Sequence, residues 1–300
     1  MGERCGDFLG EFYDYDAGTR KLTTRTVEKA RMIQTWLGAR KEGKTSVTAR
    51  QISVIMGLLF WTASVLALPL CKYFHLLRDY RKAGALASVA QEYDTVAIEL
   101  TPTATSELNE WLRVAIANKE TAMHPELFGK PSLSLIVDAS GIGYCAIATT
   151  DFTDCQILSG SWSGDQKHLA QSSVWAEPEC IYLACLRYVR QEDRFVRVFT
   201  DHSPIVYANR AGYAKGFNPN HLLERLKRTF PNTLFEIVHV KGELNPADRY
   251  SRLGDMMGEK ELNGEELKMV AMLAAEEWGQ CLKDNVSSAS AYNKRPTFMV

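Results

Sequence analysis

The second half of the chain places four acidic residues at the ends of predicted secondary-structure elements. Asp138 closes the apolar run SLSLIV, and Asp201 follows the run RFVRVFT. Glu179 lies in the helix-like stretch AEPECIYLACL, and Asp248 follows the strand-like run FEIVHV and a short loop. Carboxylates that converge in this way repel one another unless a cation is present. The pattern therefore predicts an α/β fold with a site for hard, oxygen-ligated cations, Mg²⁺ or Mn²⁺ rather than zinc.

Three short motifs surround the aspartates. They are Asp-Ala-Ser-x-x-Gly from Asp138, Thr-Asp-His around Asp201, and Asn-Pro-Ala-Asp-x-x-Ser-Arg around Asp248. Together they resemble the ribonuclease H domain of retroelement reverse transcriptases. The third is the most specific, because it resembles the closing motif of this domain in gypsy-type, DIRS-type and pararetrovirus polymerases. The resemblance covers roughly residues 130–253 and implies a ribonuclease H-like mixed sheet with flanking helices.

The resemblance also implies an activity, which is metal-dependent hydrolysis of the RNA strand of an RNA–DNA hybrid. Two Mg²⁺ ions, or Mn²⁺ in their place, would be held by a catalytic and metal-binding set: Asp138, Glu179, Asp201 and Asp248. Glu177 is the rival of Glu179, and the two cannot share a helix face. Because Pro178 suits the first turn of a helix, we predict that Glu177 is a cap and Glu179 the metal ligand.

Before this part, the apolar pattern resembles the thumb and connection of a DIRS-like or gypsy-like reverse transcriptase. The predicted division is a thumb-like helical region at 1–83, a connection and linker at 84–131, the ribonuclease H-like domain at 132–253 and a C-terminal helical tail at 254–300. No Tyr-x-Asp-Asp or Phe-x-Asp-Asp occurs in the chain. The polymerising aspartates are therefore missing, and we expect no polymerase activity from this chain alone.

Apolar periodicity and capping residues predict the individual elements. In the first part we expect helices over 27–40, 48–66, 70–83 and 106–117, with a strand over 95–100. In the second part we expect strands over 133–136, 144–148, 156–162, 195–200 and 234–240, and helices over 176–190, 203–209, 221–230 and 248–253.

Charge and cysteine content bear on whether the chain binds nucleic acid and on the cellular compartment in which it is found. The net charge is −1, but residues 20–50 hold nine Lys and Arg residues, which either track a phosphate backbone or form a solvated helix face. The seven cysteines make no Cys-x-x-Cys pair, which favours a reduced, intracellular protein, cytoplasmic or nuclear. Residues 52–70 carry no charge, and we expect a packed helix there rather than a membrane span.

Other readings remain open at this point. His202 and His239 are candidates for proton transfer, although a strand histidine that faces a neighbour is the commoner arrangement. The chain is also compatible with a catalytically silent, retroelement-derived scaffold or interaction module in a ribonucleoprotein, or with part of a larger polymerase polyprotein. An integrase- or resolvase-like nuclease is a third reading, against which the Asn-Pro-Ala-Asp-x-x-Ser-Arg ending argues. Cleavage of a hybrid on titration with Mg²⁺ separates the enzyme from the scaffold.

Overall fold

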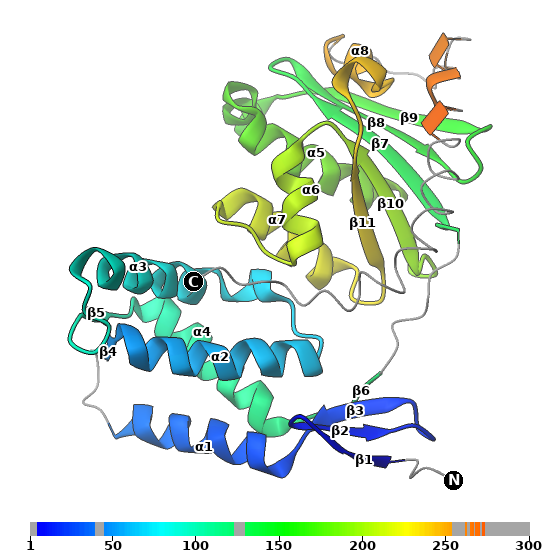
Figure 1. The fold of residues 1–300 in the computed structure, drawn as a ribbon. Coiled ribbons are helices and arrows are strands. Elements are labelled where there is room, and N and C mark those ends of the chain that lie inside the picture. Colours follow the sequence, from blue (N-terminus) through cyan, green and yellow to red (C-terminus); the bar gives the residue numbers. More distant parts are fainter. Residues whose placement is uncertain are drawn as a thin grey trace. The chain divides into compact units, whose positions relative to one another are not determined.

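The computed structural model describes residues 5–39, 45–122 and 130–253, with 262, 265–266, 268–270 and 272–273. The chain divides into two compact units, one of residues 1–129 with 207–228 and one of residues 130–206 with 229–300. The first unit is mostly helical, and the second is built on a mixed sheet (Figure 1). The predicted fold class is therefore confirmed, whereas the four-part division of the chain stays a prediction.

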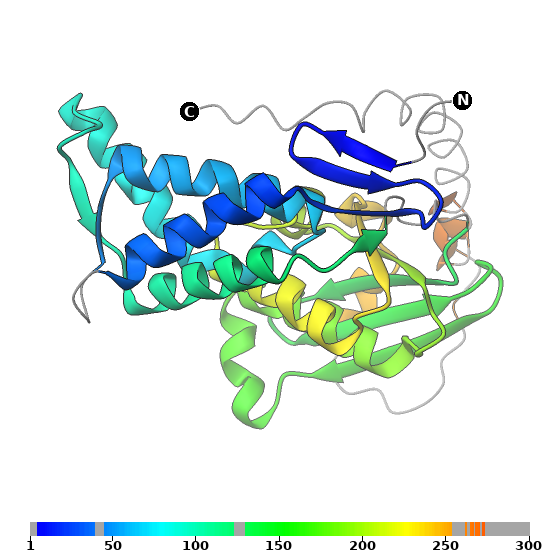
Figure 2. The ribbon, with the colours of Figure 1, turned by 90° about the horizontal axis from the view of Figure 1, so that it is seen from below.

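The first unit is a small helical assembly beside a short antiparallel sheet (Figure 2). Its helices are α1 (Thr24–Gly38), α2 (Ala49–Val65), α3 (Phe74–Ala90), α4 (Pro102–Ala117) and most of α7 (Phe217–Thr229), with a 3₁₀ turn η1 (Leu70–Tyr73). Its sheet has the order β1 (Cys5–Phe8), β2 (Glu11–Asp14), β3 (Thr19–Leu22) and β6 (Thr121–Ala122), and β4 (Ser46–Thr48) pairs with β5 (Ala97–Glu99).

Helix α2 shows why the apolar run packs within this unit. Thr48 and Gln51 form a capping box at its start, which satisfies amides that a helix otherwise leaves without partners. Its buried Thr62 donates a hydrogen bond to the Leu59 carbonyl oxygen at 2.8 Å, so the hydroxyl is satisfied inside the core. The helix expected over 48–66 is confirmed. None of the described helices combines the length and apolarity that a bilayer crossing requires.

The second unit holds a five-stranded sheet with the order β11-β10-β7-β8-β9. The strands are β7 (Leu133–Ala139), β8 (Gly143–Thr149), β9 (Cys155–Ser161), β10 (Phe195–Thr200) and β11 (Leu234–His239). The first three form an antiparallel meander, and β10 runs parallel to both β7 and β11. The other elements are η2 (Gly164–Gln171), α5 (Ser173–Tyr188), α6 (Ser203–Ala211), which crosses the division between the units, η3 (Gly242–Leu244) and α8 (Ala247–Ser251).

Strand β7 lies at the centre of this sheet and is buried on both faces. Six consecutive residues, Leu133–Asp138, are buried, as expected for a strand covered on two sides. Helix α5 packs on β7 and β8, and α8 packs on β7, β8 and β9. Gly143 begins β8 where a Cβ atom would lie 2.1 Å from the Gly160 carbonyl oxygen, so only glycine allows this pairing with β9. The strand that carries Asp138 is thus held by its neighbouring strands β8 and β10 and by the helices α5 and α8.

The C-terminal tail predicted at 254–300 lies largely outside the described residues. Within the described part, Leu262, Val270 and Leu273 are buried in a core that includes Ile136 of β7 and Tyr250 of α8. Some tail residues therefore complete the core of the second unit.

Candidate metal centre

The register of two parallel strands brings Asp138 and Asp201 together. In the β7–β10 pairing Ile136 lies opposite Phe199. Asp138 lies two residues after Ile136, and Asp201 lies two residues after Phe199. Because side chains alternate between the two faces of a sheet, residues two apart point to the same face. Asp138 and Asp201 therefore leave the same face of the sheet at the carboxyl ends of adjacent parallel strands. The geometry places these two carboxylates close together, and their role as metal ligands stays a prediction.

Helix α5 supplies the third carboxylate, Glu177. Ser172 caps this helix by accepting a hydrogen bond from the Val174 amide at 3.3 Å, so the helix starts five residues before Pro178. Glu177 lies on the same helix face as buried Cys180 and Ile181, which directs it toward β7. Its Oε1 atom accepts a hydrogen bond from the Ala139 amide at 3.3 Å.

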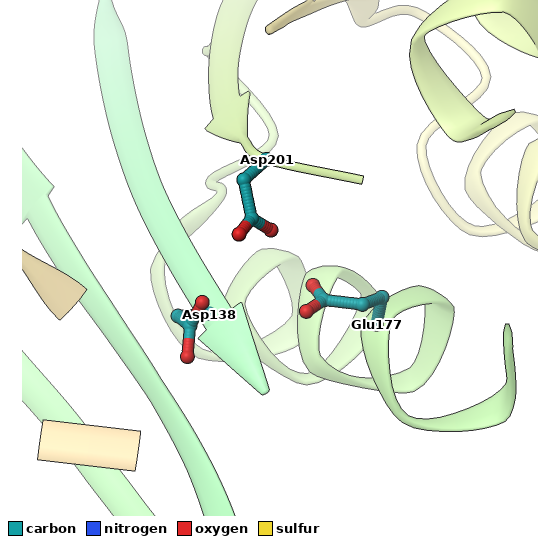
Figure 3. A group of neighbouring side chains, drawn as sticks. All are labelled: Asp138, Glu177 and Asp201. Atoms are coloured by element: carbon teal, nitrogen blue, oxygen red, sulfur yellow. The ribbon is translucent and has the colours of Figure 1, made fainter. Parts of the chain in front are cut away.

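Asp138, Glu177 and Asp201 form one compact cluster. One carboxylate oxygen from each lies within 4.8 Å of those of the other two. Figure 3 shows the Asp201 and Glu177 side chains, from β10's end and from α5, directed toward Asp138 on β7. Asp138 and Glu177 are each only 3% exposed. Three carboxylates at this separation, two of them buried, are a ligand set of hard oxygen atoms of the kind that Mg²⁺ prefers.

Burial and mutual repulsion make the charged forms of these groups unfavourable. Burial, followed by the charges of Asp138 and Asp201, raises the pKa of Glu177 to about 9. Burial also raises the pKa of Asp138 to about 6, a hydrogen bond from Ser251 opposes that shift, and Asp201 and Asp248 add to it. Both shifts have the sign expected for carboxylates that lack a counter-charge.

One carboxylate oxygen of Glu177 is available to bind a cation. Among the described residues, Glu177 Oε2 is buried and has no hydrogen-bond partner. An unsatisfied buried oxygen costs free energy that a bound cation would offset. The residues present therefore fit a divalent, oxygen-ligated metal ion.

The sequence-based choice between the two glutamates requires a correction. The cluster contains Glu177 and excludes Glu179, which is only partly buried. The prediction placed Pro178 in the first helical turn, but α5 begins at Ser173 and carries Pro178 inside it. The stripe of buried residues at Cys180, Ile181 and Ala184 continues back to Glu177, and this spacing was the signal in the sequence that could have identified it.

Asp248 lies beside the cluster and is not part of it. Its carboxylate forms an ion pair with Arg252 one helical turn later, at 2.6 Å between Oδ1 and a terminal guanidinium nitrogen. It is nevertheless close enough for its charge to raise the pKa of Asp138. Of the four residues expected from the sequence, the cluster contains Asp138 and Asp201, Glu177 takes the place of Glu179, and Asp248 is paired with an arginine.

Asn245, from the same motif, fixes α8 to the central strand. Its side-chain amide donates to the Val137 carbonyl oxygen at 2.9 Å, and its side-chain oxygen accepts from the Ala247 amide at 3.1 Å. Asn245 is 4% exposed, so both hydrogen bonds are protected from water. One residue therefore binds the first amide of α8 and ties the helix to β7 directly before Asp138.

The loop before α8 also approaches Asp201. A Cβ atom at Gly242 would lie 2.9 Å from Asp201 Oδ2, so a side chain at this position would require the Asp201 carboxylate to shift. His202, which follows Asp201, has a pKa lowered by burial, and its Nδ1 atom has no hydrogen-bond partner in the described part of the chain. His239 is exposed at the end of β11. Of the two histidines, His202 is the one adjacent to a cluster residue.

The second unit thus combines a five-stranded mixed sheet with a carboxylate cluster at the ends of two of its strands. No protein-family model and no curated protein matches the chain. Among solved structures, foamy viral protease-reverse transcriptase in complex with an RNA/DNA hybrid is 11% identical, with a TM-score of 0.28, over 87% of this chain and 32% of the viral chain. The same viral protein in complex with dsDNA is 12% identical, with a TM-score of 0.29. This similarity covers 80% of this chain and 45% of the viral chain.

A second kind of solved structure is similar to a shorter stretch. LC11-RNase H1 in complex with an RNA/DNA hybrid is 17% identical, with a TM-score of 0.29. The similarity covers 39% of this chain and 91% of that one. The chain spans less than half the length of the foamy viral chains that it resembles.

Proposed function

We propose that this chain is a metal-dependent endonuclease that hydrolyses the RNA strand of RNA–DNA hybrids. The observation that carries the proposal is the cluster of Asp138, Glu177 and Asp201, whose carboxylate oxygens lie within 4.8 Å of one another at the end of a ribonuclease H-like sheet. The motif around Asp248, with its resemblance to retroelement ribonuclease H, supports the hybrid as the substrate.

The chain's own residues would each have a defined task. Asp138, Glu177 and Asp201 would hold two Mg²⁺ ions, or Mn²⁺, and Asp248 would join them by exchanging Arg252 for a cation. Bound in this way, the metal ions supply Lewis acidity for the attacking water and the leaving oxygen. His202, whose pKa is lowered by burial, would exchange a proton beside Asp201.

We further propose that the chain derives from a DIRS-like or gypsy-like retroelement polymerase. The first unit would correspond to the thumb and connection, with boundaries near residues 83 and 131, and residues 132–253 to the ribonuclease H-like domain. Its lysines and arginines within residues 20–50 would contact the phosphate backbone of the hybrid. The expected setting is intracellular, either cytoplasmic or nuclear, alone or within a polymerase polyprotein.

A cleavage assay tests the function. The substrates are one sequence as an RNA–DNA hybrid, as double-stranded RNA and as double-stranded DNA, each with and without Mg²⁺. We expect cleavage of the RNA strand of the hybrid alone, only with Mg²⁺, and loss of cleavage in Asp201→Asn, which keeps the side-chain size but removes a charge that binds metal. A folded chain that leaves the hybrid intact under all these conditions would favour the silent scaffold.

A further inference from the structure

Ser251, the last residue of α8, contacts the candidate metal centre without belonging to it. Its hydroxyl oxygen lies 2.6 Å from Asp138 Oδ2 and 2.9 Å from the Asp248 carbonyl oxygen. The side chain is fully buried, with 0% of its surface exposed. A buried hydroxyl at these distances has one proton and two acceptors to choose between.

The distances decide between the two acceptors. The Asp138 carboxylate oxygen is the closer one, at 2.6 Å against 2.9 Å, and a carboxylate is a stronger acceptor than a backbone carbonyl, so the hydroxyl donates to Asp138 Oδ2. This hydrogen bond occupies one oxygen of the carboxylate and leaves Oδ1 for a cation. Hydrogen bonds of this kind set the orientation of a metal ligand in protein sites.

Ser251 is itself held in place from both sides. Its backbone carbonyl oxygen accepts a hydrogen bond from Ser140 Oγ at 2.6 Å. Ser140 also accepts from the amides of Ile142 and Gly143 in the turn that follows β7. At the other end of α8, Asn245 is bonded to Val137 of the same strand. The short helix is therefore attached to β7 on each side of Asp138, and the hydroxyl has a fixed position.

We propose that Ser251 is a positioning residue that orients Asp138 for the cation. This inference rests on the proposed function for the presence of the cation, and it adds a role for the serine of the Asn-Pro-Ala-Asp-x-x-Ser-Arg motif. Ser251 touches neither the substrate nor the reacting atoms. It acts through Asp138, by keeping one carboxylate oxygen turned away from the site.

The test measures Mg²⁺ binding to the whole chain by isothermal titration calorimetry, without nucleic acid. The variants are Ser251→Ala, which removes the donor, Ser251→Thr, which keeps it, and Ser251→Cys, which keeps the size but donates weakly. Ser134→Ala is the matched control, because Ser134 is a buried serine of β7, 2% exposed, that lies four residues before Asp138. Melting temperatures without metal report whether each variant folds.

We expect the Mg²⁺ dissociation constant to rise about tenfold in Ser251→Ala and in Ser251→Cys, as is typical when a residue that supports a metal ligand is removed. Ser251→Thr and Ser134→Ala should bind Mg²⁺ as the wild type does. If Ser251→Ala does not fold, the Mg²⁺ affinity of Ser251→Cys tests the proposal instead. Wild-type affinity in a folded Ala or Cys variant would overturn the proposal, as would a wild-type chain that binds no Mg²⁺. Normal Mg²⁺ binding without hybrid cleavage would instead contradict only the proposed activity.

Discussion

Burying Glu177 beside two aspartates makes its charge unfavourable when no cation is bound. Its pKa is raised from 4.5 to about 9, first by burial and then by Asp138 and Asp201. Between these two values the folded chain keeps a proton that the unfolded chain has released. The protonated Glu177 therefore contributes its full stabilisation below about pH 4.5, and this contribution is lost as the pH rises toward about 9. The pKa of Asp138 is also raised, from 3.8 to about 6, so its contribution to stability likewise falls as the pH rises between these values.

The first prediction follows from that sign. Without metal, the wild type should melt several degrees lower at about pH 8 than at about pH 5. Glu177→Gln should show a smaller difference, because it removes the group that loses its proton. The control is Glu179→Gln, which removes a carboxylate from the same helix but outside the cluster. Equal pH dependence in wild type and Glu177→Gln, measured by thermal melting, would contradict the assignment.

Arg252 provides the second prediction at this scale. Its pair with Asp248 is solvent-exposed, with 62% and 37% of the two side chains accessible, so its loss should change the free energy of unfolding by less than about 1 kcal/mol. Arg252→Gln should nevertheless tighten Mg²⁺ binding, because it removes a cation beside the cluster and releases Asp248. Arg249→Gln is the matched control, since Arg249 pairs with Glu266. Calorimetry at low salt measures the difference, and weaker binding in Arg252→Gln would refute this account.

At the scale of elements, α8 shows how a short motif becomes a rigid support. A five-residue helix has little stability of its own, and the contacts of Asn245 with Val137 and Ala247 hold it on the sheet. Asn245→Ala would remove the hydrogen bond to the buried Val137 carbonyl oxygen and the hydrogen bond from the first amide of α8. We expect a loss of about 1–3 kcal/mol in the free energy of unfolding, measured by chemical denaturation.

The control for this change is Lys241→Ala, in the same loop but exposed. It should stay within about 0.5 kcal/mol of the wild type, as surface substitutions usually do. A cost for Asn245→Ala no larger than that of Lys241→Ala would show that its hydrogen bonds do not hold the helix.

Helix boundaries separate what the sequence could predict from what it could not. The strand over 195–200 and the helix over 48–66 were predicted closely, because apolar patterning indicates both. The start of α5 was placed too late because Pro178 favours a first turn, whereas burial of the surrounding residues outweighs the cost of a proline inside the helix. Helix α4 likewise begins earlier than expected, at Pro102, because Thr101 caps it.

The site was predicted in the same uneven way. Asp138 and Asp201 each follow an apolar strand, so their approach was expected from these strand ends and from the motifs around them. Glu177 could not be chosen over Glu179 without knowing which helix face packs on β7. The pairing of Asp248 with Arg252 depends on local side-chain geometry, which no periodicity in the sequence indicates.

At the scale of the whole molecule, a cation bound at the cluster would couple metal binding to folding. A cation that binds the folded chain and not the unfolded one raises the melting temperature in proportion to the logarithm of its concentration. We expect Mg²⁺ and Mn²⁺ to stabilise the chain and EDTA to reverse the effect, and Ca²⁺ to bind without supporting cleavage. A melting curve that does not change with millimolar Mg²⁺ would argue for the silent scaffold.

The most direct measurement compares hybrid cleavage by Glu177→Gln and Glu179→Gln at saturating Mg²⁺. The two substitutions make the same chemical change two residues apart on α5, but only Glu177 lies in the cluster with Asp138 and Asp201. We predict that Glu177→Gln lowers the cleavage rate by several orders of magnitude and that Glu179→Gln cleaves as the wild type does. Normal cleavage by a folded Glu177→Gln variant would contradict the proposed metal centre.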